Sequence, residues 1–283
     1  MRRYRFRGCS TGSDLEALPI SDWQLAILVF GLWSQALGTN QRREDQRPKT
    51  KPKTKDPMDD HLRIEFNEWA RAGRGEGMEK GHRPVGEQAI ALMQLPIDAR
   101  VLDVGCGSGW ATRLMAEQAS EGKVIGIDIA DEMVELATES SQNLTNVEFK
   151  VATAESLPFS SSEFTHAFSM ESLYYYTNVV AALREIHRVL EDGGLFITVI
   201  DLYLENTPSH QWIPTLNVPV HLLGIPDYRT LFEEAGFVNI RDDRLHDPRP
   251  VPDDYTGGSF NTREDYLQYR EIGSLMLAGE AHK

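Results

Sequence analysis

Short apolar runs alternate with stretches of helical periodicity from residue 58 onward. Six runs have the length of buried strands: 100–105, 123–128, 146–150, 164–169, 194–200 and 237–241. Between them, apolar residues recur three and four positions apart, as in the group Tyr228, Leu231, Phe232 and Ala235. Strands that alternate with amphipathic helices are typical of a parallel sheet covered by helices. The pattern predicts an α/β domain over residues 100–283, with a further apolar run at 274–281 as a seventh strand.

Two segments outside the predicted sheet carry side chains that are common in recognition sites. Residues 58–99 form a lead-in to the first strand, and part of it places Trp69, Met78 and His82 among glycines. Such a segment suits a lid that closes on a substrate. A helix that ends at residues 72–73, followed by an ordinary loop, explains the same pattern. Residues 201–223 lack periodicity, which predicts a lid, a binding loop or a mobile segment.

The first 57 residues differ from the rest in charge and composition. They hold 11 Lys and Arg against 6 Asp and Glu, whereas the remainder holds 18 against 37. An apolar run at 23–33 is shorter than the roughly 20 residues of a membrane span. The Pro- and Lys-rich segment after it is too polar to fold. Three interpretations stay open: sequence upstream of a natural start at Met58, a membrane or targeting segment, and a disordered tail.

Charge and cysteine content exclude several classes of function. The net charge is −14, and an acidic body repels a phosphate backbone, so nucleic acid is not expected as a partner. The two cysteines, Cys9 and Cys106, are too few for a disulfide framework or a zinc site, which indicates a reducing, cytoplasmic setting. Membrane contact is expected only through residues 1–57, and the assembly is expected to be a monomer or a homodimer.

The stretch VLDVGCGSGW places glycine at alternate positions directly after an apolar run that contains an acid, Asp103. Gly105, Gly107 and Gly109 let the backbone turn sharply and present its N–H groups to a ligand. In an open α/β sheet such a loop lies outside the carboxyl ends of the strands, where ligands bind. A dinucleotide fingerprint needs Gly or Ala at the position of Trp110, so the spacing disfavours a nicotinamide or flavin cofactor.

VLDVGCGSGW resembles the first motif of the class I S-adenosylmethionine-dependent methyltransferases. Four later segments resemble the same family in the same order: GIDIADEMVELA, VATAESLPFSSSEF, SMESLYYY and ALREIHRVLEDGGLF. The resemblance covers roughly residues 84–200 and, less specifically, 226–281. It implies a doubly wound, seven-stranded, mostly parallel sheet whose last strand runs antiparallel. It also implies that the cofactor is S-adenosylmethionine (SAM) and that an N-terminal segment, 58–99, covers it.

The resemblance assigns a set of residues to the cofactor. Asp128, at the tip of the second predicted strand, matches the family's acidic ribose-binding position, where a carboxylate can accept both ribose hydroxyls. A solvated or helix-capping acid is the alternative for Asp128, and a structural acid bonded to loop amides is the alternative for Asp103. Asp131 is expected to cap the helix that follows. The remaining cofactor residues implied are Gly105, Gly107, Gly109, Ile129, Ala154, Glu155, Ser169 and Met170.

Methyl transfer from a sulfonium is an in-line displacement, which requires a closely held acceptor and the exclusion of water. It requires no metal and no covalent enzyme intermediate. The site can add a base for the proton of the acceptor. The candidates are Glu171, Tyr174 and Tyr175 after the fourth strand, and His210 in the segment 201–223. Because consecutive tyrosines cannot all face one site, one or two of them are expected only to pack.

The expected function is transfer of a methyl group from SAM to a small-molecule acceptor. SMES stands where amino-methylating nucleic-acid enzymes carry an NPPY-type sequence. The LPF and LREIHRVLEDGG segments resemble a broad group that includes quinone C-methyltransferases and thiol-methylating enzymes. A ring carbon of a quinone or isoprenoid and a thiol or hydroxyl of a small metabolite both stay open as acceptors. The alternatives are a non-catalytic SAM-binding module, an enzyme that uses a SAM derivative, and a nucleotide-dependent reductase.

Overall fold

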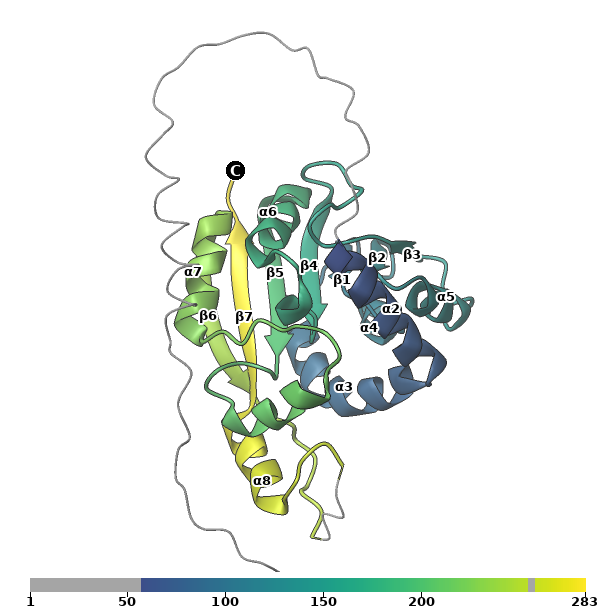
Figure 1. Cartoon of the computed structure of the whole chain (residues 1–283). Coiled ribbons are helices and arrows are strands. Elements are labelled where there is room, and N and C mark those ends of the chain that lie inside the picture. Colours follow the sequence, from purple (N-terminus) through teal and green to yellow (C-terminus); the bar gives the residue numbers. More distant parts are fainter. Residues whose placement is uncertain (1–56, 254–257) are drawn as a thin grey trace, which may run out of the picture. The chain divides into compact units, whose positions relative to one another are not determined.

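A computed structural model describes residues 57–253 and 258–283, which contain a seven-stranded sheet (Figure 1). The strand order is β3-β2-β1-β4-β5-β7-β6, and every neighbouring pair is parallel except the two pairs that involve β7. The strands are β1 (Arg100–Val104), β2 (Lys123–Asp128), β3 (Val147–Val151), β4 (Phe164–Met170), β5 (Leu190–Ile200), β6 (Phe237–Leu245) and β7 (Ser274–Ala281). The seven predicted strands and the antiparallel last strand are confirmed. The leader predicted at 1–57 lies outside the described residues except for its last position.

Helices cover both faces of the sheet. The helices are α2 (Pro57–Arg71), α3 (Arg74–Met93), α4 (Trp110–Gln118), α5 (Asp131–Glu139), α6 (Val179–Val189), α7 (Ile225–Ala235) and α8 (Arg263–Ile272), with two 3-10 helices, η1 (Leu173–Tyr175) and η2 (Thr207–Thr215). Side chains of β1 alternate between two buried clusters. Val101 packs with α3 and α4, whereas Leu102 and Val104 pack in the cluster that contains α6 and α7. The sheet is therefore buried on both faces, as a parallel sheet requires.

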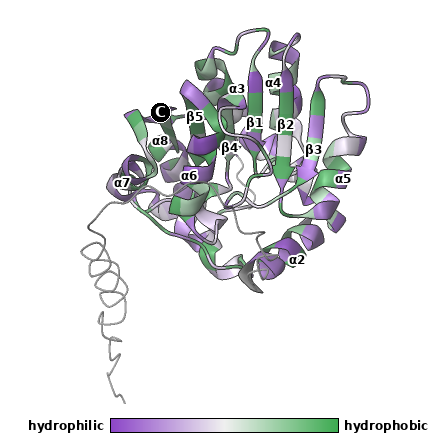
Figure 2. Cartoon of the chain, turned by 90° about the horizontal axis from the view of Figure 1, so that it is seen from above, coloured by the Kyte–Doolittle hydropathy of each residue, from purple (hydrophilic) through white to green (hydrophobic). Residues whose placement is uncertain are grey.

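The apolar residues are concentrated along the middle of the sheet. In Figure 2 the central parts of β1 and β2 are coloured as hydrophobic, while polar colours dominate on the outer faces of the helices. Among the described residues, no helix combines the length and the apolar character needed to cross a bilayer.

The glycine loop after β1 adopts a backbone that side chains would prevent. Gly105, Gly107 and Gly109 have φ values of 76°, 51° and 76°, all left-handed. A Cβ at Gly105 would lie 2.5 Å from Cβ of Ser172, and one at Gly109 would lie 2.8 Å from the ring of Phe149. At Gly107 a Cβ would meet no atom within 4 Å. The outer two glycines are thus needed for close packing, and the middle one faces open space.

The lead-in consists of two consecutive helices, which decides against one of the two sequence-based alternatives. The expected loop after residues 72–73 is wrong, because α3 begins at Arg74 and continues to Met93. Gly86 inside α3 allows the helix to pack against α4, since a Cβ there would lie 2.4 Å from the indole ring of Trp110. Packing of this kind outweighs the low helix propensity of glycine. The close approach of α3 and α4 therefore depends on the glycine at position 86, whereas Gly77 and Gly81 face open space.

Two smaller expectations also differ from the structure. The N-cap of α5 is Ala130, so the expected cap at Asp131 is wrong. The side chain of Asn67 in α2 donates a hydrogen bond to the Asp131 carboxylate (2.8 Å) and accepts one from the backbone N–H of Glu132 (3.0 Å). The first turn of α5 is thereby tied to α2. The segment 201–223, which has no sequence periodicity, contains the 3-10 helix η2 at Thr207–Thr215.

Candidate active site

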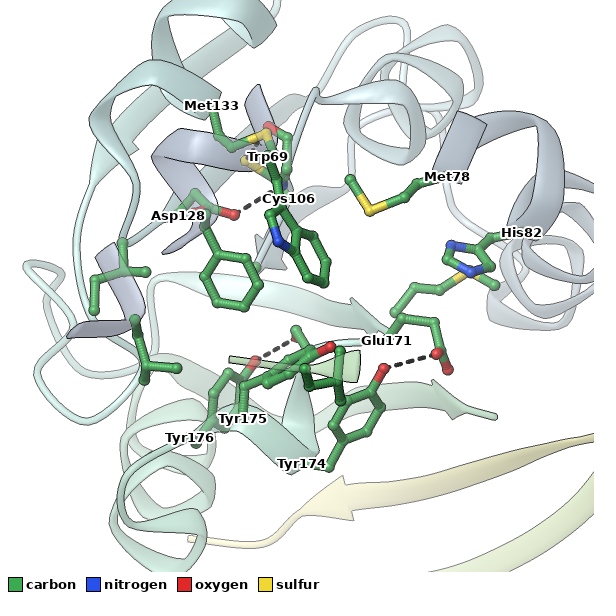
Figure 3. A pocket seen from close by; sticks show the side chains of 18 of the residues that line it. Trp69, Met78, His82, Cys106, Asp128, Met133, Glu171, Tyr174, Tyr175 and Tyr176 are labelled. Carbon is green, nitrogen blue, oxygen red and sulfur yellow. Dashed lines mark hydrogen bonds between the residues drawn. The ribbon is translucent and has the colours of Figure 1, made fainter. Parts of the chain in front are cut away.

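A cavity of about 540 Å³ lies at the carboxyl ends of β1, β2 and β4, in the position that an open α/β sheet offers to ligands (Figure 3). Its volume is within the range typical of small-molecule sites. The glycine loop and the segments 127–129, 152–155 and 170–177 form the sheet side of the cavity. Residues of α2, α3 and η2 and the segment 258–261 form the other walls. The lead-in and the segment after β5 thus meet at the same cavity.

Asp128 lies at the tip of β2 and joins the glycine loop to the start of α5. Its Oδ2 accepts a hydrogen bond from Gly107 N–H and its Oδ1 accepts one from Ala130 N–H, both at 2.9 Å. Burial raises the pKa of Asp128, and the N–H groups of Ala130 and Gly107 oppose that shift. Each carboxylate oxygen has two lone pairs. Asp128 can therefore still accept hydrogen bonds from hydroxyl groups of a ligand in the cavity.

Asp103 lies in β1 behind the glycine loop and is 1% exposed. Its Oδ2 accepts a hydrogen bond from Oγ1 of Thr112 in α4 at 2.6 Å. Burial raises the pKa of Asp103 to about 7; the hydrogen bond from Thr112 lowers it and the nearby charge of Asp128 raises it further. Asp103 is not among the residues that line the cavity, so it supports the loop from behind.

The remaining cofactor candidates divide into lining and supporting residues. Gly105, Gly107, Ile129, Ala154, Glu155 and Met170 line the cavity. Oε1 of Glu155 accepts a hydrogen bond from Asn178 N–H at 3.2 Å, and burial raises the pKa of this carboxyl. Gly109 and Ser169 are not lining residues. Gly109 is the N-cap of α4, and the hydroxyl of Ser169 is buried and lies 2.7 Å from that of Ser172.

Tyr174, Tyr175 and Tyr176 all line the cavity, although they are consecutive. The turn of η1 makes this possible, because it directs the three rings differently (Figure 3). The hydroxyl of Tyr174 donates to Oε2 of Glu171 at 2.8 Å, and that of Tyr176 lies 2.9 Å from Oγ of Ser172. Burial raises the pKa of each of these phenols, so all three are protonated at neutral pH.

Glu171 lies at the cavity wall directly after β4, near His82 of α3 (Figure 3). Its backbone is left-handed, with φ 55°, which is uncommon for residues other than glycine. Burial and the charge of Asp201 raise the pKa of Glu171 well above its usual range. Burial lowers the pKa of His82, and Asp201 opposes that shift. The sequence analysis selects Glu171 and His82, but it does not connect either of them with Asp201.

His210 is the one catalytic candidate that does not line the cavity. Its Nε2 lies 3.1 Å from the backbone oxygen of Tyr203. Its neighbours in η2, Gln211 and Trp212, do line the cavity. Cys106 also lines it, and burial raises the pKa of this thiol well above its usual value, which is consistent with a packing residue.

Apolar and aromatic side chains make up much of the cavity wall that does not come from the sheet. They come from α2, η2 and the segment before α8, and include Leu62, Phe66, Trp69, Trp212, Leu216 and Phe260. The ring of Phe66 contacts the rings of both Trp69 and Tyr175 edge to face, at centroid distances of 5.2 and 5.0 Å. The sequence signals for these walls were the recognition-type side chains of the lead-in and the lack of periodicity in 201–223. Phe260 gave no such signal.

Comparison with known proteins identifies the family. The family described as "Methyltransferase domain" matches residues 102–198, from β1 to β5. A chain described as a methyltransferase, in complex with the Trm112 methyltransferase activator of Haloferax volcanii, is 31% identical with a TM-score of 0.73. That match covers 77% of this chain and 98% of the other. This chain belongs to the class I SAM-dependent methyltransferases.

Two further relatives of the methyltransferase are more distant. The demethylmenaquinone methyltransferase of Staphylococcus aureus is 27% identical over 188 residues, which cover 56% of this chain and 76% of that protein. A SAM-dependent methyltransferase of Mesorhizobium loti is 20% identical with a TM-score of 0.54, over 69% of this chain and 97% of that one. The latter shows the shared fold. The resemblance drawn from five sequence motifs is confirmed, and with it methyl transfer as the reaction and SAM as the cofactor.

The residues at the cavity fit SAM. The loop of the methyltransferase offers open space at Gly107, where no atom lies within 4 Å of a Cβ position. The Asp128 carboxylate, whose oxygens keep free lone pairs, borders the same space. A cofactor with two ribose hydroxyls and a positively charged sulfur matches a wall that combines a carboxylate with bare backbone.

Proposed function

We propose that this methyltransferase acts on a small, largely apolar acceptor, with a ring carbon of a hydroxylated quinone-type ring as the preferred target. The observation that carries this proposal is the composition of the cavity wall. Besides the glycine loop and Asp128, the wall contains many apolar and aromatic side chains, among them Phe66, Trp69 and Leu216. Aromatic and aliphatic walls favour an apolar ligand of matching size. The similarity to a demethylmenaquinone methyltransferase supports the same class.

In this proposal the cofactor occupies the sheet side of the cavity. Asp128 accepts the ribose hydroxyls, Ile129 contacts the adenine ring, and Ala154 and Glu155 lie at its edge. Gly105 and Gly107 allow the methionine portion to approach the backbone, with Met170 beside it. Asp103, Gly109 and Ser169 act indirectly, because they hold the loop and the end of β4 in place.

The acceptor then lies between the sulfur and the aromatic walls. An electron pair of the acceptor forms the new bond to the methyl carbon, and the carbon–sulfur electron pair returns to sulfur, which leaves as S-adenosylhomocysteine. The acceptor finally gives up a proton. Glu171, Tyr174 and Tyr175 form the wall that an acceptor hydroxyl would face. Helix α2, with Phe66 and Trp69, excludes water from this part of the site.

The proposal is tested with radiolabelled SAM and three acceptors offered separately to the full chain. These are a reduced quinone with an isoprenoid tail, the same ring without the tail, and a small polar thiol. We expect label in the tailed ring, with kcat/KM at least tenfold above that for the bare ring. Label in the thiol alone, or equal rates for the two rings, would contradict an apolar acceptor.

A variant in the aromatic wall separates the acceptor from the cofactor. Phe66→Ala removes a ring that packs on Tyr175. We expect KM for the acceptor to rise about tenfold, which corresponds to about 1.4 kcal/mol of lost binding. The affinity for SAM, measured by calorimetry, should stay within about twofold. A loss confined to SAM binding would place the cofactor, and not the acceptor, at this wall.

We also propose an activator subunit as a partner, which extends the expected monomer or homodimer. The observation behind it is the 31% identity to a chain from a Trm112 complex, over almost the whole of that chain. Co-expression with a Trm112-type protein, followed by size-exclusion chromatography, tests it. We expect co-elution in equal amounts and a higher melting temperature, because binding to the folded state alone stabilises it. Separate elution at micromolar concentrations would contradict the proposal.

A further inference from the structure

Three potential metal ligands, His82, Glu171 and Asp201, lie close together beside the cavity. His82 and Glu171 line the cavity on the side away from Asp128 (Figure 3), and the buried Asp201 lies behind them. Glu171 directly follows β4, Asp201 directly follows β5, and His82 reaches them from α3. The two carboxylates are neighbours because β4 and β5 are adjacent parallel strands, whose carboxyl ends share one edge of the sheet. One potential ligand atom of each residue lies within 4.8 Å of those of the other two.

The spacing of these atoms suits a shared ion better than direct contact. Within residues 57–253 and 258–283, no hydrogen bond or ion pair joins His82 to Glu171 or Asp201. Ligand atoms at the usual 2.0–2.2 Å from Zn²⁺ lie about 3–4.4 Å from one another. The three atoms lie within 4.8 Å of one another, so shifts of less than about 1 Å each would bring them onto one ion.

Asp201 supplies an independent sign of a ligand. The residue is 3% exposed, and its Oδ2 accepts a hydrogen bond from the hydroxyl of Tyr269 at 2.7 Å. Its Oδ1 is buried and has no partner in the described part of the chain. A buried carboxylate oxygen without a partner is costly. An ion bound by the cluster would satisfy it.

The carboxylates are also held as metal ligands usually are. Tyr174 O–H and the backbone N–H of Asp201 both donate to Glu171, and Tyr269 O–H donates to Asp201. Hydrogen bonds of this kind orient ligating side chains and are important for affinity. The left-handed backbone of Glu171 is uncommon for a residue other than glycine, and such backbone conformations are often found at functional positions.

We propose that His82, Glu171 and Asp201 bind one divalent transition-metal ion, Zn²⁺ or Mn²⁺, at the acceptor side of the cavity. One imidazole nitrogen with two carboxylate oxygens suits these ions better than Mg²⁺ or Ca²⁺, which prefer oxygen ligands only. Three protein ligands leave a coordination position open. The open position would take a hydroxyl oxygen of the acceptor, whose proton is then lost more readily. Only this last assignment rests on the proposed function.

The test uses the full, untagged chain after treatment with a chelator. Zn²⁺ and Mn²⁺ are titrated separately by calorimetry, and bound Mn²⁺ is also followed by electron paramagnetic resonance. We expect one ion per chain, and binding at least tenfold weaker in Glu171→Gln and in Asp201→Asn. Asp59→Asn is the matched control, because it changes another partly buried carboxyl of the same cavity outside the cluster. It should bind the ion as the wild type does.

Circular dichroism and SAM calorimetry on each variant show whether a loss is local. Should either carboxylate variant fail to fold, His82→Gln provides the same test from a different element. Wild-type protein that binds neither ion in stoichiometric amounts overturns the proposal, as do cluster variants with wild-type affinity. A chain that transfers methyl groups without binding an ion refutes the metal site and leaves the proposed function standing.

Discussion

Asp103 should make the stability of the protein depend on pH in a way that one substitution removes. The carboxyl is 1% exposed, and burial raises its pKa from 3.8 to about 7. A carboxyl with a raised pKa binds its proton more tightly in the folded than in the unfolded state. Its contribution therefore stabilises the fold at low pH and is lost as the pH rises from about 4 to about 7.

The size of the effect follows from the two pKa values. Between pH 5 and pH 8, the linkage relation gives a loss of about 2–3 kcal/mol from this one group. The Asp103→Asn variant keeps the shape and a hydrogen-bond acceptor for Thr112 but has no such titration. The free energy of unfolding of the wild type, relative to that of the variant, should therefore fall by about 2–3 kcal/mol over this interval.

The assay is urea denaturation of both proteins at pH 5, 6, 7 and 8, without cofactor. Most other titrating groups affect both proteins equally, so only the difference between the two curves is used. Parallel curves would refute the argument, because they would mean that Asp103 is already ionised at pH 5.

Three further variants test other parts of the structure. Asp128→Asn should weaken SAM binding in calorimetry by at least tenfold, because charge-assisted hydrogen bonds contribute about 1.5–3 kcal/mol. Wild-type affinity in this variant would mean that the ribose does not bind at Asp128. Asn67→Ala deletes two hydrogen bonds between α2 and α5, so the rate of backbone amide hydrogen exchange in α2 should rise about fivefold or more. An unchanged exchange rate would mean that other contacts hold α2 in place. Gly86→Ala should cost about 1–3 kcal/mol through overlap with Trp110, whereas Gly77→Ala, in open space on the same helix, should stabilise by about 0.5–1 kcal/mol. Equal effects at the two glycines, measured by thermal melting, would contradict the packing argument.

The sheet could be predicted because burial dictates its sequence pattern. A strand covered on both faces needs a continuous apolar run, as in β1, β2 and β7. The edge strands β3 and β6 are more exposed, and their runs are more polar. The glycine loop was equally visible, since only glycine tolerates the left-handed backbone at Gly105 and Gly109. Asp128 followed from its place directly at the end of a strand.

The walls of the cavity opposite the sheet were harder to predict, because they depend on long-range packing. Helix α3 contains several glycines, and its helical state reflects contacts such as that of Gly86 with Trp110. Once α3 is in place, it carries His82 to the ends of β4 and β5. Asp201 was assigned to the start of an irregular segment, and nothing local in the sequence relates it to a histidine 119 positions earlier. Clusters formed by residues so distant in the chain leave no periodic signal.

The insertion of β7 between β5 and β6 has a consequence for the order of assembly. Strand β6 has no other neighbour in the sheet, so it cannot join the sheet until β7, which follows it in the chain, has docked on β5. Closing this part of the sheet requires contacts over long sequence separations, which slow folding. Until then β5 exposes an unpaired apolar edge, the kind of surface that chaperones cover and that aggregates form on. Low yields of variants in β7 would therefore report a failure of maturation, even where the finished enzyme is fully competent.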